Sequence, residues 1–149
     1  MIESLFLVKI KAMNDRSTNL KSIRPIIASA QVNDNMTADE CFQNATLRPI
    51  IKMQNHLLIV VFRNYIGKRK NVFYDLSLVK KLDYIENAIQ KDMKFRNSVK
   101  GMIIGQFTVE EYELYIQNSS ALNKRMMSIV KERLVSNIQL FTQPLAQAI

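Results

Sequence analysis

The sequence predicts an all-α fold, arranged as a single-domain bundle of about five helices. Glycine and proline number only three each, whereas sheet sandwiches and barrels need many tight turns that draw on these residues. Eight methionines, with many leucine, isoleucine, lysine and glutamine residues, favour helices. Long stretches also place apolar residues three and four positions apart, which is the period of an amphipathic helix. A chain of 149 residues, 48% of them hydrophobic, can bury one core.

The chain divides into three predicted parts. Residues 1–21 are weakly patterned and are expected to be a weakly ordered N-terminal segment. Residues 22–141 are expected to form a single helical domain, and residues 142–149 a tail. Met13 offers an alternative start, which would make residues 1–12 an upstream extension.

The N-terminus lacks the features of a secretory signal. It has no charged n-region and no small-residue cleavage site. No apolar run in the chain reaches the roughly 18 residues that a membrane span needs. We therefore expect a cytoplasmic protein that is not attached to a membrane.

Two stretches read almost alike, SIRPII at 22–27 and TLRPII at 46–51. In each, a hydroxyl residue stands where a helix N-cap belongs. Proline follows three positions later, where its missing N–H is one of the unpaired donors of a first turn. The pattern therefore predicts helix starts at Ser22 and at Thr46.

A second interpretation is open for Pro49. Thr37 and Glu40 have the spacing of a capping box, and a helix that begins there can run through the proline with a kink. In either case the helix over 46–66 is expected to be the spine of the bundle, because apolar residues occupy most of its sides. Gly67 is its expected C-cap.

The remaining helices carry start and stop signals of the same kind. Ser77 is the predicted N-cap of a long helix that runs to a second capping box at Thr108. Ser119 or Ser120 is expected to be the N-cap of the last helix, and Pro144 is expected to end that helix.

The net charge of +8 is spread evenly along the chain. Its most ordered feature is a row of basic residues that fall within about 80° of one another on the helix over 46–66, or directly follow its end. We call this row the cationic face; it comprises Arg48, Lys52, His56, Arg63, Lys68, Arg69 and Lys70. No acidic residue lies between positions 41 and 74.

Two outcomes are open for the cationic face. Asp83, Glu86 and Asp92 on neighbouring helices can neutralise it, which we expect because solvated charged faces are common on helices. Left without these partners, the face would be a groove for an anionic partner, and nucleic acid is the candidate.

Two further groups of residues have alternative interpretations. Asp92 and Arg96 are four residues apart on a predicted helix, which favours a structural ion network; a polar functional pocket is the alternative. Gly101 and Gly105 would leave a flat patch where another helix can approach closely. That patch is a candidate surface for self-association.

The residues of common catalytic and metal sites are scarce. Cys41 is the only cysteine and His56 the only histidine, so a disulfide within the chain and a cysteine-based zinc site are excluded. A nucleophilic triad would have to use His56, and no phosphate-binding loop, dinucleotide fingerprint or HExxH motif occurs. We predict no catalytic residues, no metal site, no cofactor and no small-molecule substrate.

A motif-poor helical bundle of this kind is more typical of an interaction module than of an enzyme. The leading hypothesis is a small non-enzymatic accessory protein with a protein partner or with self-association. Nucleic-acid binding through the cationic face is the alternative.

Four segments carry a resemblance to known proteins. They are FQNATLRPIIKMQN, YIENAIQKDMKFRN, KGMIIGQFTVEEYELYIQNSSALNKRMM and KERLVSNIQLF, within residues 37–141. Together they resemble a family of small bacterial proteins that are often automatically labelled glyoxalase. The label implies a lactoylglutathione lyase, built of βαβββ modules with histidine and glutamate around a divalent metal. The predicted helices and the single His56 do not fit that label, and the resemblance assigns no site residue.

Overall fold

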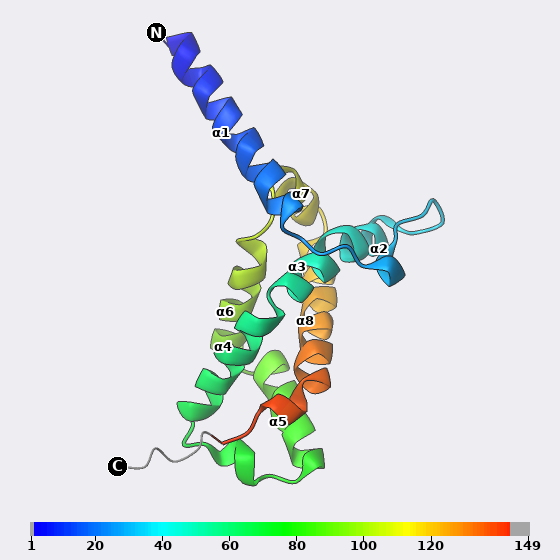
Figure 1. Ribbon diagram of the computed structural model, residues 1–149. Helices are drawn as coiled ribbons and strands as arrows, with labels where there is room; N and C mark the ends of the chain where they lie inside the picture. Colours follow the sequence, from blue (N-terminus) through cyan, green and yellow to red (C-terminus); the bar gives the residue numbers. More distant parts are fainter. Residues whose placement is uncertain (1, 144–149) are drawn as a thin grey trace.

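The computed structural model describes residues 2–143, apart from the side chains of residues 12–14. Every regular element in this part of the chain is helical, which confirms the all-α prediction (Figure 1). The longer helices are α1 (Ile2–Ser22), α4 (Asn55–Gly67), α5 (Leu78–Gln90), α6 (Met93–Ile104) and α8 (Ser119–Ser136). Shorter helices are α2 (Ala38–Phe42), α3 (Arg48–Met53) and α7 (Val109–Tyr115). The bundle therefore has more helices than the five or so that we predicted.

Four short segments complete the chain. A π-helical segment, η2 (Gln43–Leu47), joins α2 to α3. The other three are 3-10 turns: η1 (Ala28–Ala30), η3 (Val72–Asp75) and η4 (Ile138–Leu140). Most of the predicted tail over 142–149 lies outside the described residues, as does the predicted helix stop at Pro144.

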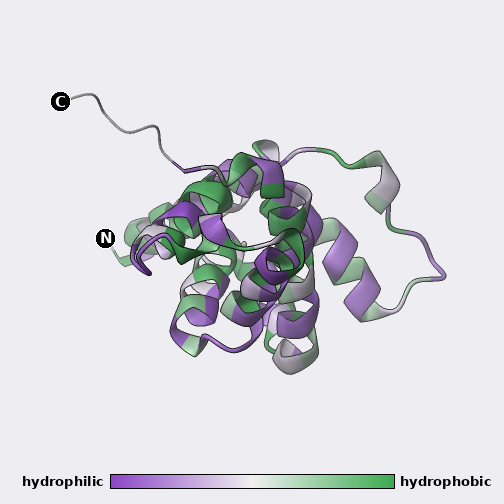
Figure 2. Cartoon of the chain, turned by 90° about the horizontal axis from the view of Figure 1, so that it is seen from below, coloured by the Kyte–Doolittle hydropathy of each residue, from purple (hydrophilic) through white to green (hydrophobic). Residues whose placement is uncertain are grey.

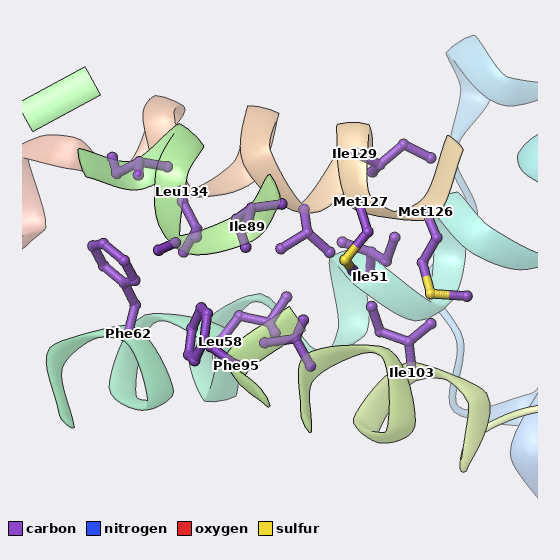
Figure 3. Packing of buried hydrophobic residues seen from close by; sticks show 14 of the residues in the cluster. Ile51, Leu58, Phe62, Ile89, Phe95, Ile103, Met126, Met127, Ile129 and Leu134 are labelled. Carbon is purple, nitrogen blue, oxygen red and sulfur yellow. The ribbon is translucent and has the colours of Figure 1, made fainter. Parts of the chain in front are cut away.

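Helix α8 runs through the middle of the core. It packs against α3, α4, α5 and α6. Figure 3 shows Met126 and Met127 pointing from α8 toward Ile51 and Ile103 on the opposite helices. Burial of such side chains is the main source of the fold's stability, at about 25 cal/mol for each Å² of apolar surface removed from water.

An aromatic cluster lies in the part of the core formed by α4, η3 and α5. The ring of Phe62 on α4 is its centre, with ring centroids 4.9 Å from Phe141 and 5.7 Å from Phe73. Tyr65, Tyr84 and Phe95 also lie around it. These edge and stacked contacts join α4 and α5 to η3, which lies between them, and to Phe141, which follows η4.

Helix α1 extends away from the bundle (Figure 1), and it is a regular secondary structure that the weak pattern of residues 1–21 does not predict. Its C-terminal half is held to the body by Arg16, whose guanidinium donates to the carbonyl oxygens of Phe107 at 2.8 Å and Gly105 at 3.1 Å. Ser17 adds a hydrogen bond to Glu110 at 3.4 Å. Large apolar side chains on the outer half are exposed, namely Ile2, Leu5, Phe6, Leu7, Val8 and Ile10.

The predicted helix start at Ser22 is wrong. Ser22 is the last residue of α1, and its hydroxyl donates backward to the carbonyl of Asn19 at 2.7 Å. Pro25 disfavours helical backbone at the residue before it, so the chain leaves the helix and forms only the η1 turn. The resulting linker swings out from the bundle before it returns at α2 (Figure 2).

The predicted helix start at Thr46 is also wrong, and the alternative of a helix that passes through Pro49 is confirmed. The capping box is present, because the Thr37 hydroxyl accepts from the Glu40 N–H and the Glu40 carboxylate accepts from the Thr37 N–H, both at 3.2 Å. The helix then widens into the π segment, in which the Arg48 N–H donates to Gln43, five residues back. The wider turn accommodates a proline that would disrupt an α-helical ladder.

The predicted spine is not one straight helix. The backbone of Gln54 departs from helical values, with φ −83° and ψ 1°, and separates α3 from α4. Apolar residues on most sides of this helix predicted that it is surrounded by neighbours, but Leu57 and Val60 are 45% and 51% exposed. Gly67 is the last residue of α4 and Lys68 its C-cap, one position later than predicted.

The caps at Ser77 and Thr108 are confirmed. The Ser77 hydroxyl accepts from the Lys80 N–H at 3.4 Å, and the capping box of Thr108 with Glu111 is complete. Both predicted caps of the last helix are wrong, because Asn118 is its N-cap and Ser119 is already its first helical residue.

Candidate anion-binding site

A polar cleft lies between the linker before α2, the π segment and α8. Its volume is about 630 Å³, within the range of small-molecule sites. Three half-buried arginines line it: Arg48 from α3, with Arg125 and Arg133 from α8. Ile27, Ser29 and Met36 form the wall contributed by the linker. We call this site the arginine cleft.

The charge of the arginine cleft is largely uncompensated. Glu40 is the only carboxylate in its lining, and that carboxylate already accepts the Thr37 N–H of the capping box. Glu132 lies at the rim, with its Oε2 4.0 Å from Arg48 Nη1, and the two side chains are 64% and 36% exposed. Such a long, exposed pair contributes little, about 0–1 kcal/mol.

The three guanidinium groups differ in how they are held. Arg125 Nη1 donates to the Gln43 side-chain oxygen at 2.8 Å, so the π segment orients this guanidinium. Arg133 has no ion-pair or hydrogen-bond partner for its side chain among residues 2–143. A half-buried guanidinium without an acceptor has lost part of its hydration, and an anion in the cleft would supply the acceptor.

A buried ion pair fixes the linker that forms one wall of the cleft. Arg24 donates through both terminal nitrogens to Glu111, at 2.7 Å each, and the two side chains are only 6% and 9% exposed. Arg24 also donates to the Gln106 carbonyl at 2.8 Å. Thr46 in the π segment donates its hydroxyl to Glu111 at 2.9 Å. The linker, α7 and the π segment therefore meet at one carboxylate.

The pKa of Glu111 reflects two opposed effects. Desolvation by burial raises it, but the hydrogen bonds from Arg24, from the Thr108 N–H and from Thr46 outweigh the burial. The net result is a pKa below the ordinary value. The carboxylate is therefore charged at neutral pH, and the network acts as a fixed structural support.

The cationic face is only partly neutralised. Arg69 pairs with Asp92 at 2.8 Å, as expected, whereas Glu86 pairs with Lys131 of α8. Asp83 takes part in no ion pair within the described part of the chain. The other members of the face are exposed and take part in none of the ion pairs described here: Lys52, His56, Arg63, Lys68 and Lys70.

Asp92 and Arg96 do not form the predicted pair. Asp92 ends the long predicted helix, because it is the N-cap of α6 and accepts the Phe95 N–H at 3.2 Å. Its other oxygen accepts from Tyr65 at 2.9 Å and from Arg69 at 2.8 Å. Arg96 instead donates to the carbonyl of Ile89 at 3.1 Å. The i, i+4 spacing was misleading because the helix breaks between α5 and α6.

Tyr65, Arg69 and Asp92 form a compact structural cluster. The Arg69 guanidinium lies 3.4 Å from the centroid of the Tyr65 ring. Burial and the hydrogen bond to Asp92 raise the pKa of Tyr65 to about 12. The hydrogen bond from the Phe95 N–H, followed by that from Tyr65, lowers the pKa of Asp92. Tyr65 is therefore a neutral donor at physiological pH and Asp92 a charged acceptor.

The glycine patch faces outward. A Cβ atom added to Gly101 would have no atom within 4 Å, and both glycines are exposed. Gly105 is the C-cap of α6, where a Cβ would come within 3.2 Å of the Gly101 carbonyl. Self-association through this patch stays a prediction, and light scattering at increasing concentration tests it.

The other residues considered for chemistry lie apart. His56 is exposed on α4, and Cys41 is half-buried in an apolar cleft with Phe42, Leu114 and Leu122. Within the described residues, no group of three or more histidine, cysteine, aspartate or glutamate side chains could hold a metal ion. No helix in the same part of the chain is long and apolar enough to cross a membrane.

Sequence reasoning found Arg48 but missed the two arginines of α8. Arg125 and Arg133 are eight residues apart, about 80° on a helix, and this spacing was the one available signal that they share a side. The pairing of Arg24 with Glu111 joins residues 87 positions apart, and no local pattern encodes it.

The comparisons with known proteins found no similar protein. Searches against protein-family models, curated proteins and solved structures gave no match to this chain. The resemblance to the glyoxalase-labelled family therefore stays a prediction.

Proposed function

We propose that this protein is a non-enzymatic binding module whose cationic face holds nucleic acid. The observation that carries the proposal is the set of four exposed Lys and Arg side chains on that face, Lys52, Arg63, Lys68 and Lys70, that take part in no ion pair with the described part of the chain. Arg48 lies at the start of the face and also lines the arginine cleft. The positive charge of the cleft therefore adjoins that of the face.

The dimensions of the face suit a phosphate backbone. The longest straight part of the face is α4 over Asn55–Gly67, which rises roughly 20 Å at 1.5 Å per helical residue, a length that covers several successive phosphates. Val60, three residues before Arg63 on α4, is 51% exposed, so a bound strand can contact apolar surface as well. The overall charge of +8 would attract the polyanion over a distance.

The expected signature is a steep dependence of affinity on salt. If the four unpaired cations each neutralise one phosphate of a single strand, the logarithm of the association constant falls with the logarithm of salt concentration with a slope of about −3. Fluorescence anisotropy with a labelled single-stranded RNA, and with a DNA duplex, measures this slope.

Charge reversal on the face provides the direct test. Lys52→Glu with Arg63→Glu should weaken RNA binding at least tenfold and make the salt slope shallower by about 1.4. The matched control is Lys80→Glu with Lys124→Glu, at two exposed lysines outside the face. This control variant has the same net charge as the face variant. Equal weakening by both pairs would show that only total charge matters. Unchanged binding in a folded face variant, or no binding at low salt, would refute the proposal.

The enzymatic alternative has its own assay. The protein would be incubated with zinc or nickel, methylglyoxal and glutathione, and the thioester product followed. We expect no turnover, because the residues described here offer no cluster for a metal ion. Sustained turnover that a chelator abolishes would favour the glyoxalase label instead.

A further inference from the structure

We propose that the arginine cleft is a separate site for a dianionic phosphoryl group, the terminal group of a phosphomonoester. The proposal does not rest on nucleic-acid binding by the cationic face, because it concerns one enclosed group and not a row of surface charges. Its ligand chemistry can come from a free nucleotide or from the terminal phosphate of an oligonucleotide.

The charge of the cleft matches this ligand. Within the lining, Arg48, Arg125 and Arg133 contribute three positive charges and Glu40 one negative charge, while Glu132 lies outside it at the rim. The excess of two in the lining is close to the charge of a phosphomonoester near neutral pH, about −1.5 to −2. Because the arginines are half-buried, their attraction for an anion is less screened than that of the exposed cations of α4.

The geometry of the donors favours phosphate over carboxylate. A guanidinium presents paired N–H groups in a fixed plane, which suits two oxygens of one anion. A phosphoryl group has three terminal oxygens, as many as there are arginines in the lining of the cleft. A carboxylate has only two oxygens and cannot satisfy all three arginines in this way.

The cleft also shows partial preorganisation. Gln43 holds Arg125 in place at 2.8 Å, and the π segment that carries Gln43 is a local departure from α-helix of a kind often found at functional sites. The linker wall is fixed by Arg24 and Glu111. Arg133, which has no side-chain partner among residues 2–143, is the group left available for the ligand.

Isothermal titration with adenosine 5′-monophosphate and with adenosine tests the chemistry. We expect saturable binding of the monophosphate, at least tenfold tighter than that of adenosine. Arg133→Gln should weaken monophosphate binding at least tenfold without loss of stability, since it breaks no side-chain hydrogen bond or ion pair with the described residues. Lys124→Gln, a neighbouring exposed residue of α8, should leave the affinity within twofold.

A conservative variant separates charge from geometry. Arg125→Lys keeps the positive charge but loses the planar fork, so monophosphate affinity should fall while the variant stays folded. Equal affinities for the monophosphate and adenosine would overturn the proposal, and so would wild-type affinity in both the Arg133→Gln and Arg125→Lys variants.

Paired oligonucleotides distinguish the two sources of the phosphoryl group. If the ligand is a nucleic-acid end, a 5′-phosphorylated strand should bind more tightly than the same strand with a 5′-hydroxyl, and Arg133→Gln should abolish the difference. If the ligand is a free nucleotide, the monophosphate binds but the two strands are equivalent. Strand binding that depends on Lys52 and Arg63, with no binding of the monophosphate and no effect of the 5′-phosphate, would sustain the proposed function and refute this inference. Monophosphate binding without strand binding would sustain this inference and refute the proposed function.

Discussion

Arg24 and Arg48 occupy the same place in two nearly identical hexapeptides, yet they have different surroundings. The Arg24 side chain is 6% exposed and makes a two-point contact with Glu111. Arg48 is half-buried at the arginine cleft, with a carboxylate only at 4.0 Å. The first arginine therefore supports the fold, and the second is available to a ligand.

The Arg24 contact makes Glu111 a sensitive position. Glu111→Gln removes the charge that compensates a buried guanidinium, so the free energy of unfolding should fall by about 3–5 kcal/mol. Urea denaturation measures the change. Glu113→Gln, on an exposed neighbour in α7, should change stability by less than about 0.5 kcal/mol. A loss below about 1 kcal/mol for Glu111→Gln would show that the pair contributes little.

The same residue gives the fold a dependence on acidic pH. The folded-state pKa of Glu111 is lower than its ordinary value of 4.5. Its stabilising contribution is therefore complete above the unfolded pKa and is lost as the pH falls below 4.5 through the folded pKa. Wild-type stability should decline over this acidic range more steeply than that of Glu111→Gln, and equal slopes in the two proteins would contradict the prediction.

Asp92 combines a helix cap with an ion pair, and two substitutions separate these roles. Asp92→Asn can still accept the Phe95 N–H but loses the charge that pairs with Arg69. Asp92→Ala loses both and should cost about 1 kcal/mol more than Asp92→Asn, the usual value of an N-cap. Thermal unfolding of the two variants provides the comparison. Equal losses would mean that the cap contributes nothing measurable.

At the scale of the elements, the π segment is the feature that most affects the site. It allows one helical path from Thr37 through Pro49 and places Gln43 beside Arg125. Because the Arg48 N–H donates to the Gln43 carbonyl, the backbone here is hydrogen-bonded and not frayed.

Hydrogen exchange tests the continuity of this helix. Amides of residues 44–48 should exchange as slowly as those of α3, since the π segment and α3 form one hydrogen-bonded path. The linker over 31–36, in which exposed residues predominate, is the internal standard for fast exchange. Fast exchange at 44–48 would indicate a helix break before Pro49.

Local signals predicted the elements well where the partners are close in sequence. The capping boxes at Thr37 and Thr108 and the cap at Ser77 follow from contacts three residues apart. The helix starts at Ser22 and Thr46 failed because the same cap-and-proline pattern is compatible with an extended linker and with a widened helix. Interactions outside the hexapeptide determine which of these structures forms, and the pattern within the hexapeptide does not distinguish them.

The site was predicted only in part, for a related reason. Periodicity along one helix identified Arg48 and the other basic residues of the cationic face. The arginine cleft also needs Arg125 and Arg133 from α8 and a linker wall held by a contact over 87 positions. Neutralisation of the face likewise depends on how helices pack. Asp92 reaches Arg69, whereas Glu86 faces α8 and pairs with Lys131.

At the scale of the whole molecule, two surfaces of positive charge adjoin at Arg48. The arginine cleft encloses a small volume between the linker and α8, and the cationic face extends from Arg48 along α3 and α4. The site proposed in the cleft takes one compact anionic group, and the site proposed on the face takes an extended polyanion. If both proposals hold, variants at Arg133 and at Lys52 with Arg63 should change the two binding activities independently.

The outer half of α1 projects from this body (Figure 1), and its removal should leave the core intact. Its large apolar side chains are exposed, whereas Arg16 and Ser17 hold the inner half of the helix to the bundle. A variant that begins at Met13 should therefore unfold in urea with a free energy within about 0.5 kcal/mol of the full chain. Arg16→Ala in the full chain is the contrast, since it loses two hydrogen bonds from a charged donor and should cost about 1.5–3 kcal/mol. A loss above about 1 kcal/mol in the Met13 variant would show that the projecting half supports the fold.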